Sequence, residues 1–254
     1  MLRRNINVVF SPGATVFPGG AIDALDGAPK MLERVVGLDD GVASAEHNLP
    51  SGGLALRVAA VRECFEEAGI LLGREARTRT AVDGDEARFK SWRERCNAGD
   101  ATVVELLERE LLVIDAGDLR LFSHWLTPLG APRRYNTWFF VARAPEGHDG
   151  AHDDNELVDS AWVRPADALA AFEHREIDLI LPTQRSLEVI SRYRTAVEIW
   201  AALPPAGHAG LAVADGSERV ALATDVDAVP HRWTNPLPDI DRELRTVSEA
   251  TCPT

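Results

Sequence analysis

Residues 62–70 (Arg-Glu-Cys-Phe-Glu-Glu-Ala-Gly-Ile) constrain this chain more than any other segment. At about 100° of rotation per residue, Glu63, Glu66 and Glu67 fall on one helix face within an arc of roughly 100°. Carboxylates this near to one another repel, and on a bare surface each pair costs the helix a few tenths of a kcal/mol. A hard divalent cation such as Mg²⁺ reverses that effect, because it binds oxygen ligands and shares them with substrate phosphates. The pattern therefore predicts either a solvated acidic face or a metal site.

A glycine turn precedes this acidic run. Residues 16–20 (Val-Phe-Pro-Gly-Gly) form an apolar pair that closes into a turn, where glycine lets backbone groups approach a ligand closely. Residues 54–61 carry small and apolar side chains at helical spacing and lead directly into Arg62. The expected order is a strand, a glycine turn, a helix with an acidic face, and a stop at Gly69.

This combination resembles the Nudix hydrolases, whose signature is a glycine followed by Arg-Glu-apolar-x-Glu-Glu-x-Gly-apolar on a helix. Residues 62–70 match the second half of that signature position for position, and the Gly19-Gly20 turn matches the first half. The signature usually places its arginine fourteen positions after the glycine, whereas Arg62 follows Gly20 by 42. We therefore place an insert at residues 27–53 and predict loops for its Asp- and Gly-rich stretches. Asp26 stands where the signature has a glutamate, and we predict a loop cap for it.

An insert at this place is similar to the peroxisomal coenzyme A diphosphatase group of Nudix hydrolases and its bacterial relatives. Residues 123–128 (Ser-His-Trp-Leu-Thr-Pro) and 132–140 (Pro-Arg-Arg-Tyr-Asn-Thr-Trp-Phe-Phe) are shared features. The resemblance implies an α/β/α sandwich around a mixed sheet. We expect a Nudix domain over residues 1–204, a helical insertion at 85–112 and a C-terminal extension at 205–254.

The resemblance also implies hydrolysis of a diphosphate bond with Mg²⁺ or Mn²⁺ as cofactor. The candidate metal ligands are three helix glutamates, a glycine of the turn and an acidic residue from a later segment: Glu63, Glu66, Glu67, Gly20 and Glu156. Glu66 and Glu67 are the strongest, Glu63 is an alternative candidate for the general base, and Glu156 is weighed against a solvated loop charge. Arg62 is expected to hold a glutamate by a bidentate contact, with an ordinary surface pair as the alternative.

Substrate candidates lie in the second shared segment. Arg133 and Arg134, with Tyr135, match the geometry of a substrate phosphate, although a strand start followed by core aromatic residues is the alternative. The branch resemblance implies that coenzyme A or acyl-CoA is cleaved to 3′,5′-ADP and (acyl-)4′-phosphopantetheine. Two other functions stay open: hydrolysis of ADP-ribose, a nucleotide sugar or a dinucleotide, and a ligand-binding module without turnover. The intact glutamates weigh against the last.

Composition limits the classes of partner and the cell compartment that we expect for this chain. The chain has 254 residues and a formal charge of −13, which argues against nucleic acid as its main partner and leaves a small diphosphate substrate. Its three cysteines form no zinc pattern or disulfide framework, which indicates a reducing compartment. The sequence shows no signal-peptide core, membrane span or C-terminal Ser-Lys-Leu address, so we expect a cytoplasmic protein without a membrane partner. A homodimer is one open assembly state.

Hydrophobic periodicity predicts the remaining elements. Helices are expected over residues 54–67, 85–96, 102–112, 165–172 and 183–203. Strands are expected within 5–17 and over 70–72, 119–126, 136–142, 156–163 and 219–223.

Overall fold

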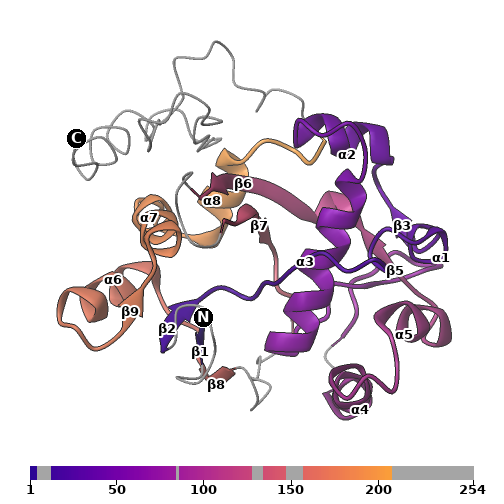
Figure 1. The fold of residues 1–254 in the computed structure, drawn as a ribbon, viewed down its shortest axis with the longest axis horizontal. Helices are drawn as coiled ribbons and strands as arrows, with labels where there is room; N and C mark the ends of the chain where they lie inside the picture. The colour runs from indigo at the N-terminus through magenta and orange to yellow at the C-terminus, as the bar shows by residue number, and fades with distance from the viewer. Residues whose placement is uncertain (5–12, 84–85, 128–133, 147–156, 208–254) are drawn as a thin grey trace.

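The acidic run lies on α3 (Gly53–Ala68), which the computed structural model places between a β-ribbon and two further helices (Figure 1). The structure describes residues 1–4, 13–83, 86–127, 134–146 and 157–207. The predicted strand at 219–223 and most of the segment before Gly13 therefore lie outside the described residues. Within the described ranges, no helix is long and apolar enough to cross a membrane.

Helices and strands are interspersed along the chain. The helices are α1 (Pro29–Leu32), α2 (Asp40–Glu46), α3 (Gly53–Ala68), α4 (Glu86–Asn97), α5 (Val103–Arg109), the short 3₁₀ helix η1 (Ala116–Asp118), α6 (Pro165–Glu173), α7 (Leu181–Ile190) and α8 (Ala196–Ala202). The strands are β1 (Leu2–Arg4), β2 (Ala14–Val16), β3 (Val35–Val36), β4 (Arg74–Glu75), β5 (Leu112–Asp115), β6 (Leu119–Leu126), β7 (Asn136–Ala142), β8 (Leu157–Ser160) and β9 (Asp178–Leu179).

The strands pair in both directions, so the predicted mixed-sheet α/β class is confirmed. In the order β8-β1-β2-β9, β1 runs antiparallel to both of its neighbours, and β2 runs parallel to β9. In the order β3-β5-β4, β5 is parallel to β3 and antiparallel to β4. β6 and β7 form a long antiparallel ribbon, from Leu119 opposite Ala142 to Leu126 opposite Asn136.

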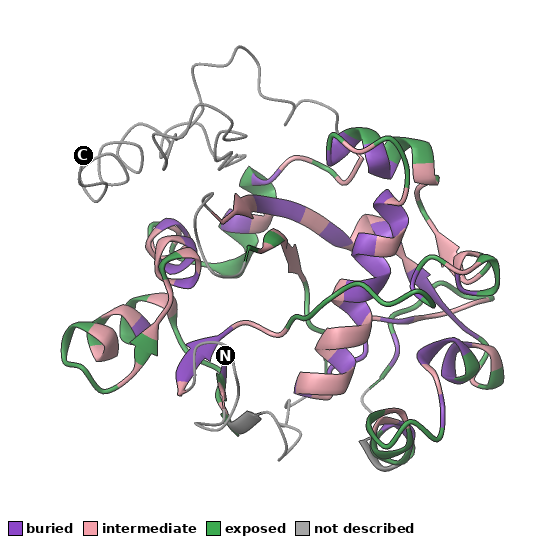
Figure 2. Ribbon diagram, viewed as in Figure 1, coloured by how far each residue is buried: buried purple, intermediate pink, exposed green. Residues whose placement is uncertain are grey.

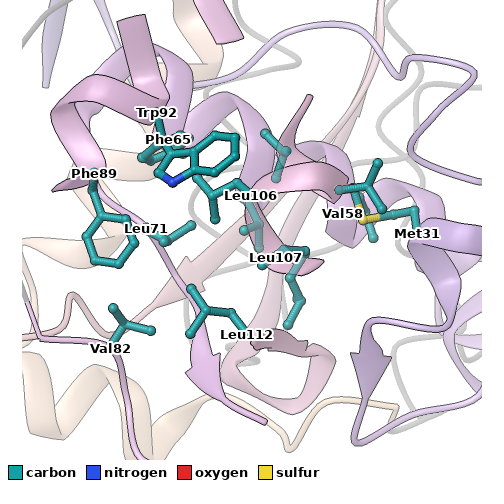
Figure 3. Packing of buried hydrophobic residues seen from close by; sticks show 14 of the residues in the cluster. Met31, Val58, Phe65, Leu71, Val82, Phe89, Trp92, Leu106, Leu107 and Leu112 are labelled. Atoms are coloured by element: carbon teal, nitrogen blue, oxygen red, sulfur yellow. The ribbon is translucent and has the colours of Figure 1, made fainter. Parts of the chain in front are cut away.

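The main hydrophobic core lies between α3, α4 and α5. Val58, Val61 and Phe65 of α3 are fully buried and pack with Leu106 and Leu107 of α5 (Figure 3). These α3 positions recur at helical spacing, so they form one apolar stripe along the helix. Figure 2 shows the result: buried residues run along α3, while its C-terminal turns, which carry the glutamates, are only half-buried. The core therefore holds α3 and leaves its acidic face accessible.

The insert at residues 27–53 is more regular than predicted. It contains α1, β3 and α2, whereas only loops were expected from its Asp- and Gly-rich composition. Asp39 caps α2 by accepting a hydrogen bond from the Val42 N–H at 2.8 Å. The Asp40 carboxylate accepts from the N–H groups of Gly52 (2.9 Å) and Leu54 (3.0 Å), which binds α2 to the first turn of α3. Asp39 and Asp40, which were expected in loops, therefore accept hydrogen bonds from the first turns of α2 and α3.

Two predicted elements were wrong for local reasons. Residues 70–72 lie outside any strand, because the Ile70 N–H bonds back to the Cys64 carbonyl at 3.3 Å and closes the helix instead. The helix predicted to reach Leu112 ends at Arg109, since Leu111 adopts a φ of 55°, and Leu112 begins β5.

The long helix predicted over residues 183–203 is two helices, α7 and α8. Ser191 ends α7, and its hydroxyl donates to the Glu188 carbonyl at 3.0 Å. Thr195 then caps α8 by accepting from the Glu198 N–H at 3.2 Å. Ser and Thr hydroxyls compete with the backbone for helical hydrogen bonds. Ser191 and Thr195 lie only four positions apart, so together they favour a break in the helix.

Strands β6 and β7 have the predicted bounds, and helices α4 and α6 begin and end within one residue of prediction. Of the strand expected over 156–163, the structure shows Leu157–Ser160.

A buried ion pair joins the insert to α3. The Arg57 guanidinium and the Glu46 carboxylate are almost fully buried, and Arg57 donates to Glu46 and to the Ala116 and Leu119 carbonyls. The Arg57 guanidinium also lies 5.2 Å from the centroid of the Phe140 ring of β7. One side chain of α3 thus connects the insert, η1 and the β6–β7 ribbon.

His47 follows this pair and is 4% exposed. Its ring meets the edges of Trp138 and Phe140, with centroid distances of 6.1 and 5.5 Å. Burial lowers the pKa of His47 to about 3, and the charges of Arg57 and His124 add to that effect. The folded chain therefore keeps this imidazole neutral at every pH where the protein is ordinarily handled.

We expect His47 to make stability fall as the pH decreases below the ordinary histidine pKa of about 6.5. In that range the unfolded chain binds a proton at His47 and the folded chain does not, so the unfolded state gains. From pH 7 to pH 5 the loss from one such group is about 2 kcal/mol. Urea unfolding of the wild type and His47→Gln at both pH values measures it, and equal pH dependence in the two proteins would contradict the assignment.

Candidate active site

The glycine turn lies directly against the acidic face of α3. The chain leaving β2 runs across α3 (Figure 1), and the Gly19 N–H donates to Glu67 Oε2 at 2.7 Å. A Cβ atom built on Gly20 would lie 2.4 Å from Glu63 Oε1, much closer than any real contact. A side chain at position 20 would therefore displace the Glu63 carboxylate from the place that it occupies beside the turn.

Arg62 lies at the centre of a network of carboxylates. Its Nη1 donates to Glu63 Oε1 at 2.7 Å and to Glu66 Oε2 at 2.9 Å. Its Nε and Nη2 donate to the two oxygens of Asp26 at 2.9 and 3.0 Å, and Nη2 also reaches the Ala21 carbonyl. The bidentate partner of Arg62 is therefore Asp26, whereas a glutamate was predicted. Arg62 still contacts two of the three glutamates, through one nitrogen.

Asp26 combines two roles. Its side chain is fully buried, and it accepts a hydrogen bond from the Asp23 N–H at 2.7 Å, so the predicted loop cap is confirmed. The same carboxylate fixes the orientation of the Arg62 guanidinium. Asp26 thus connects the loop after the glycine turn to the acidic face of α3.

Burial and charge act against each other at this site. Burial raises the pKa of Glu63 above its ordinary value, while Arg62 lowers it and the nearby Glu66 and Asp26 raise it further. Burial disfavours the charged form of Arg62, but its contacts with Asp26 and Glu63 raise its pKa overall, so it stays a cation. Burial raises the pKa of the Cys64 thiol to about 12, which leaves this cysteine protonated and unreactive.

Comparison with known proteins identifies the family. A profile described as the NUDT19 Nudix domain matches residues 38–190. The chain belongs to the Nudix hydrolases.

Similar Nudix proteins occur in animals and bacteria. The chain is 30% identical over 220 residues to the acyl-coenzyme A diphosphatase NUDT19 of Gallus gallus, covering 71% of this chain and 57% of that protein. It is 30% identical over 218 residues to the protein of that name from Homo sapiens, covering 72% of this chain and 57% of the relative. The chain thus spans little more than half the length of these relatives.

A solved structure shows the same fold. The crystal structure of a NUDIX hydrolase from Alicyclobacillus acidocaldarius aligns with a TM-score of 0.63 and 27% identity, covering 79% of this chain and 86% of that one. The Nudix family and the mixed-sheet α/β fold expected from residues 62–70 are therefore confirmed.

The Nudix carboxylates are held by protein donors in this structure. Among the described residues, no three His, Cys, Asp or Glu side chains form a ready-made metal cluster. Arg62 Nη1 occupies one oxygen each of Glu63 and Glu66, and the Gly19 N–H occupies one of Glu67. The donor set nevertheless fits a hard cation, since it consists of carboxylates on one helix turn beside a backbone cradle that a Cβ at Gly20 would fill. Glu156 lies outside the described residues.

Two of the predicted substrate residues, Arg134 and Tyr135, directly precede β7. Arg134 is exposed, and its Nε donates to the Thr127 carbonyl at 3.0 Å, while the Tyr135 N–H donates to the Thr127 hydroxyl at 3.0 Å. Both residues therefore tie β7 to the end of β6. Arg133 lies outside the described residues.

The aromatic residues Trp138, Phe139 and Phe140 of β7 pack within the fold, as expected for a strand that begins with core aromatic residues. Phe139 meets the edge of Phe17, just before the glycine turn, at a centroid distance of 6.3 Å. Phe140 packs against the main core. Trp138 stacks on His124 at 4.5 Å with an interplanar angle of 8°. β7 thus reaches the glycine turn through the Phe139–Phe17 contact.

Two polar residues of α4 contact the acidic turn of α3 and were missed by sequence reasoning. Arg93 donates to the carbonyls of Glu66 and Glu67 at 2.9 and 2.7 Å, and Asn97 donates to the Glu66 carbonyl at 3.2 Å. Their spacing places them on one face of α4, but nothing in the sequence indicates which helix that face meets.

Proposed function

We propose that this Nudix domain hydrolyses the diphosphate bond of coenzyme A or acyl-CoA with a divalent cation, giving 3′,5′-ADP and (acyl-)4′-phosphopantetheine. The observation that carries the proposal is the arrangement of Glu63, Glu66 and Glu67 against the Gly19-Gly20 backbone. The substrate class follows from the NUDT19 relatives, which are named acyl-coenzyme A diphosphatases and align with most of this chain.

Each residue of the site has its own role in this proposal. A bound Mg²⁺ or Mn²⁺ supplies neutralisation of phosphate charge and a bound water of lowered pKa. Glu66 and Glu67 hold the ion, with Gly20 and Glu156 as further ligands. Glu63 orients or deprotonates the attacking water. Arg62 bridges Glu63 and Glu66 through one nitrogen, while Asp26 orients Arg62.

We further propose residues 1–204 as the Nudix domain, with 205–254 as an extension. Helix α8 ends at Ala202, and Leu203 is buried in a small cluster with Phe122, Val189 and Ile199. This packing supports a domain end close to the end of α8.

Turnover on a panel of diphosphates tests the function. Coenzyme A, acyl-CoA, ADP-ribose, nucleotide sugars and dinucleotides are each incubated with Mg²⁺, with Mn²⁺ or with excess chelator, and the products are identified by mass. We expect hydrolysis of coenzyme A or its acyl esters that chelator abolishes. Preferred cleavage of another diphosphate would replace the substrate, and activity in excess chelator would contradict the metal-dependent chemistry.

Arg134 is expected to select for the 3′-phosphate that distinguishes coenzyme A from other ADP-containing diphosphates. A charge-assisted hydrogen bond contributes about 1.5–3 kcal/mol, or on the order of 10- to 150-fold in kcat/KM. Arg134→Ala should therefore lower kcat/KM for coenzyme A while barely changing that for 3′-dephospho-CoA. Arg109→Ala, on the exposed surface of α5, is the matched control. An equal loss on both substrates would assign Arg134 to the fold or to the diphosphate.

A further inference from the structure

The last turn of α3 has backbone carbonyls that the helix itself cannot satisfy. A helix leaves its final carbonyls without intrahelical partners. At this end, Gly69 adopts a left-handed φ of 70°, its N–H bonds to the Phe65 carbonyl at 2.9 Å, and the Ile70 N–H bonds to the Cys64 carbonyl at 3.3 Å. The turn that ends the helix thus satisfies the carbonyls of Cys64 and Phe65. The carbonyls that come next along the helix belong to Glu66 and Glu67.

Helix α4 supplies donors to these two carbonyls. Arg93 directs Nε to the Glu66 carbonyl at 2.9 Å and Nη2 to the Glu67 carbonyl at 2.7 Å, so one planar guanidinium bridges two consecutive residues. Asn97, one turn later, adds a donor to the Glu66 carbonyl at 3.2 Å. A cation here also matches the negative end of the helix dipole. The contact joins residues of two helices that lie 26 and 27 positions apart in sequence.

The helix that carries Arg93 is anchored in the main core. On the same helix, Phe89 and Trp92 are buried in the main core, and Trp92 Nε1 donates to Glu110 Oε1 at 2.7 Å. Arg93 itself is half-buried against α3. A guanidinium fork is planar and makes two directed bonds, whereas a lysine ammonium on a flexible stem acts as a point charge. The geometry therefore fixes the orientation of the last turn of α3 as well as its charge.

We propose that Arg93 is a positioning residue for the metal site: by gripping the Glu66 and Glu67 carbonyls, it sets the directions in which their side chains leave α3. The inference rests on the proposed function, in which Glu66 and Glu67 hold the ion. It also gives the helical segment at 85–112 a role, because α4 contacts the backbone of the turn that carries Glu66 and Glu67, whereas the glycine turn contacts the Glu67 carboxylate.

The test measures metal binding without turnover. The Kd for Mn²⁺ is determined by titration calorimetry on the full chain for the wild type, Arg93→Ala and Arg93→Lys, and amide hydrogen exchange is followed across residues 61–72. Arg95→Ala is the matched control, because Arg95 lies on the same helix, is exposed and stacks on Trp92 instead of contacting α3. We expect Arg93→Ala to raise the Mn²⁺ Kd about 10-fold or more, as for other residues that orient metal ligands.

Arg93→Lys should show a smaller but clear rise in the Mn²⁺ Kd, with faster exchange confined to the last turn of α3, and Arg95→Ala should match the wild type. The lysine variant keeps the test informative if Arg93→Ala unfolds. A wild-type chain that binds Mn²⁺, with Arg93 variants that bind it within about twofold as tightly, would overturn the inference alone. A wild-type chain that binds no Mn²⁺ would overturn the proposed function, and this inference with it.

Discussion

Glu66→Gln and Glu67→Gln are each expected to lower kcat for diphosphate hydrolysis by about 10²–10³-fold, the size of loss seen when a charge-stabilising group is removed from an active site. Glutamine has nearly the same size and helix propensity as glutamate, so α3 should persist. Its amide oxygen can still accept from Arg62 at position 66 and from the Gly19 N–H at position 67. The change therefore removes the negative charge that a hard cation needs and keeps the local contacts.

Initial rates with Mg²⁺ and with Mn²⁺, together with thermal unfolding of each variant, measure this effect. Glu173→Gln provides the control, since Glu173 is an exposed residue at the end of α6. We expect the control to keep wild-type rates and all variants to unfold within a few degrees of the wild type. Rates close to wild type in both Glu66→Gln and Glu67→Gln would refute the assignment of these residues as metal ligands.

The second large effect is expected at the buried pair of Glu46 and Arg57. Glu46→Gln leaves the Arg57 cation in the core without a counter-charge, and breaking such a pair costs about 3–5 kcal/mol in the free energy of unfolding. The remaining bonds of Arg57 to the Ala116 and Leu119 carbonyls do not replace the lost charge. The loss should lower Tm by roughly 10 °C for a chain of this size.

Denaturant unfolding of Glu46→Gln, of the double variant Glu46→Leu/Arg57→Met, and of Lys30→Ala tests this interpretation. The double variant should lose less stability than Glu46→Gln, because it leaves no buried charge unpaired. Lys30 pairs with Glu108 at 2.8 Å on the surface, and its loss should cost at most about 1 kcal/mol. A Glu46→Gln variant no less stable than Lys30→Ala would show that the pair does not hold the insert to α3.

The sequence predicted the acidic helix well, because its information is local. The spacing of Glu63, Glu66 and Glu67 alone places them on one face, and Gly69 marks the stop where the chain turns into a left-handed conformation. β6 and β7 were also predicted with their observed bounds, since both are long, contain aromatic residues, and are separated by Pro and Gly.

Predictions failed where a side chain could serve either of two local structures. Asp39 and Asp40 read as loop residues but cap α2 and the start of α3, and Ser191 and Thr195 interrupt a pattern that looked like one helix. Aspartate, serine and threonine favour both turns and helix caps, so their presence indicates an interruption but does not distinguish a loop from the start of a new helix.

By itself, the sequence determined the Nudix family, the acidic face of α3 and the glycine turn that meets it, because these depend on residues close in sequence or on a spaced motif. Only the tertiary structure decided that Arg62 is held by Asp26, that Glu46 neutralises Arg57, and that Arg93 caps the turn carrying Glu66 and Glu67. Each of these contacts joins segments that are distant in sequence or separated by a turn. Their partners are chosen by how the helices pack around one core, and a guanidinium carries no local signal of which carboxylate or carbonyl it will meet.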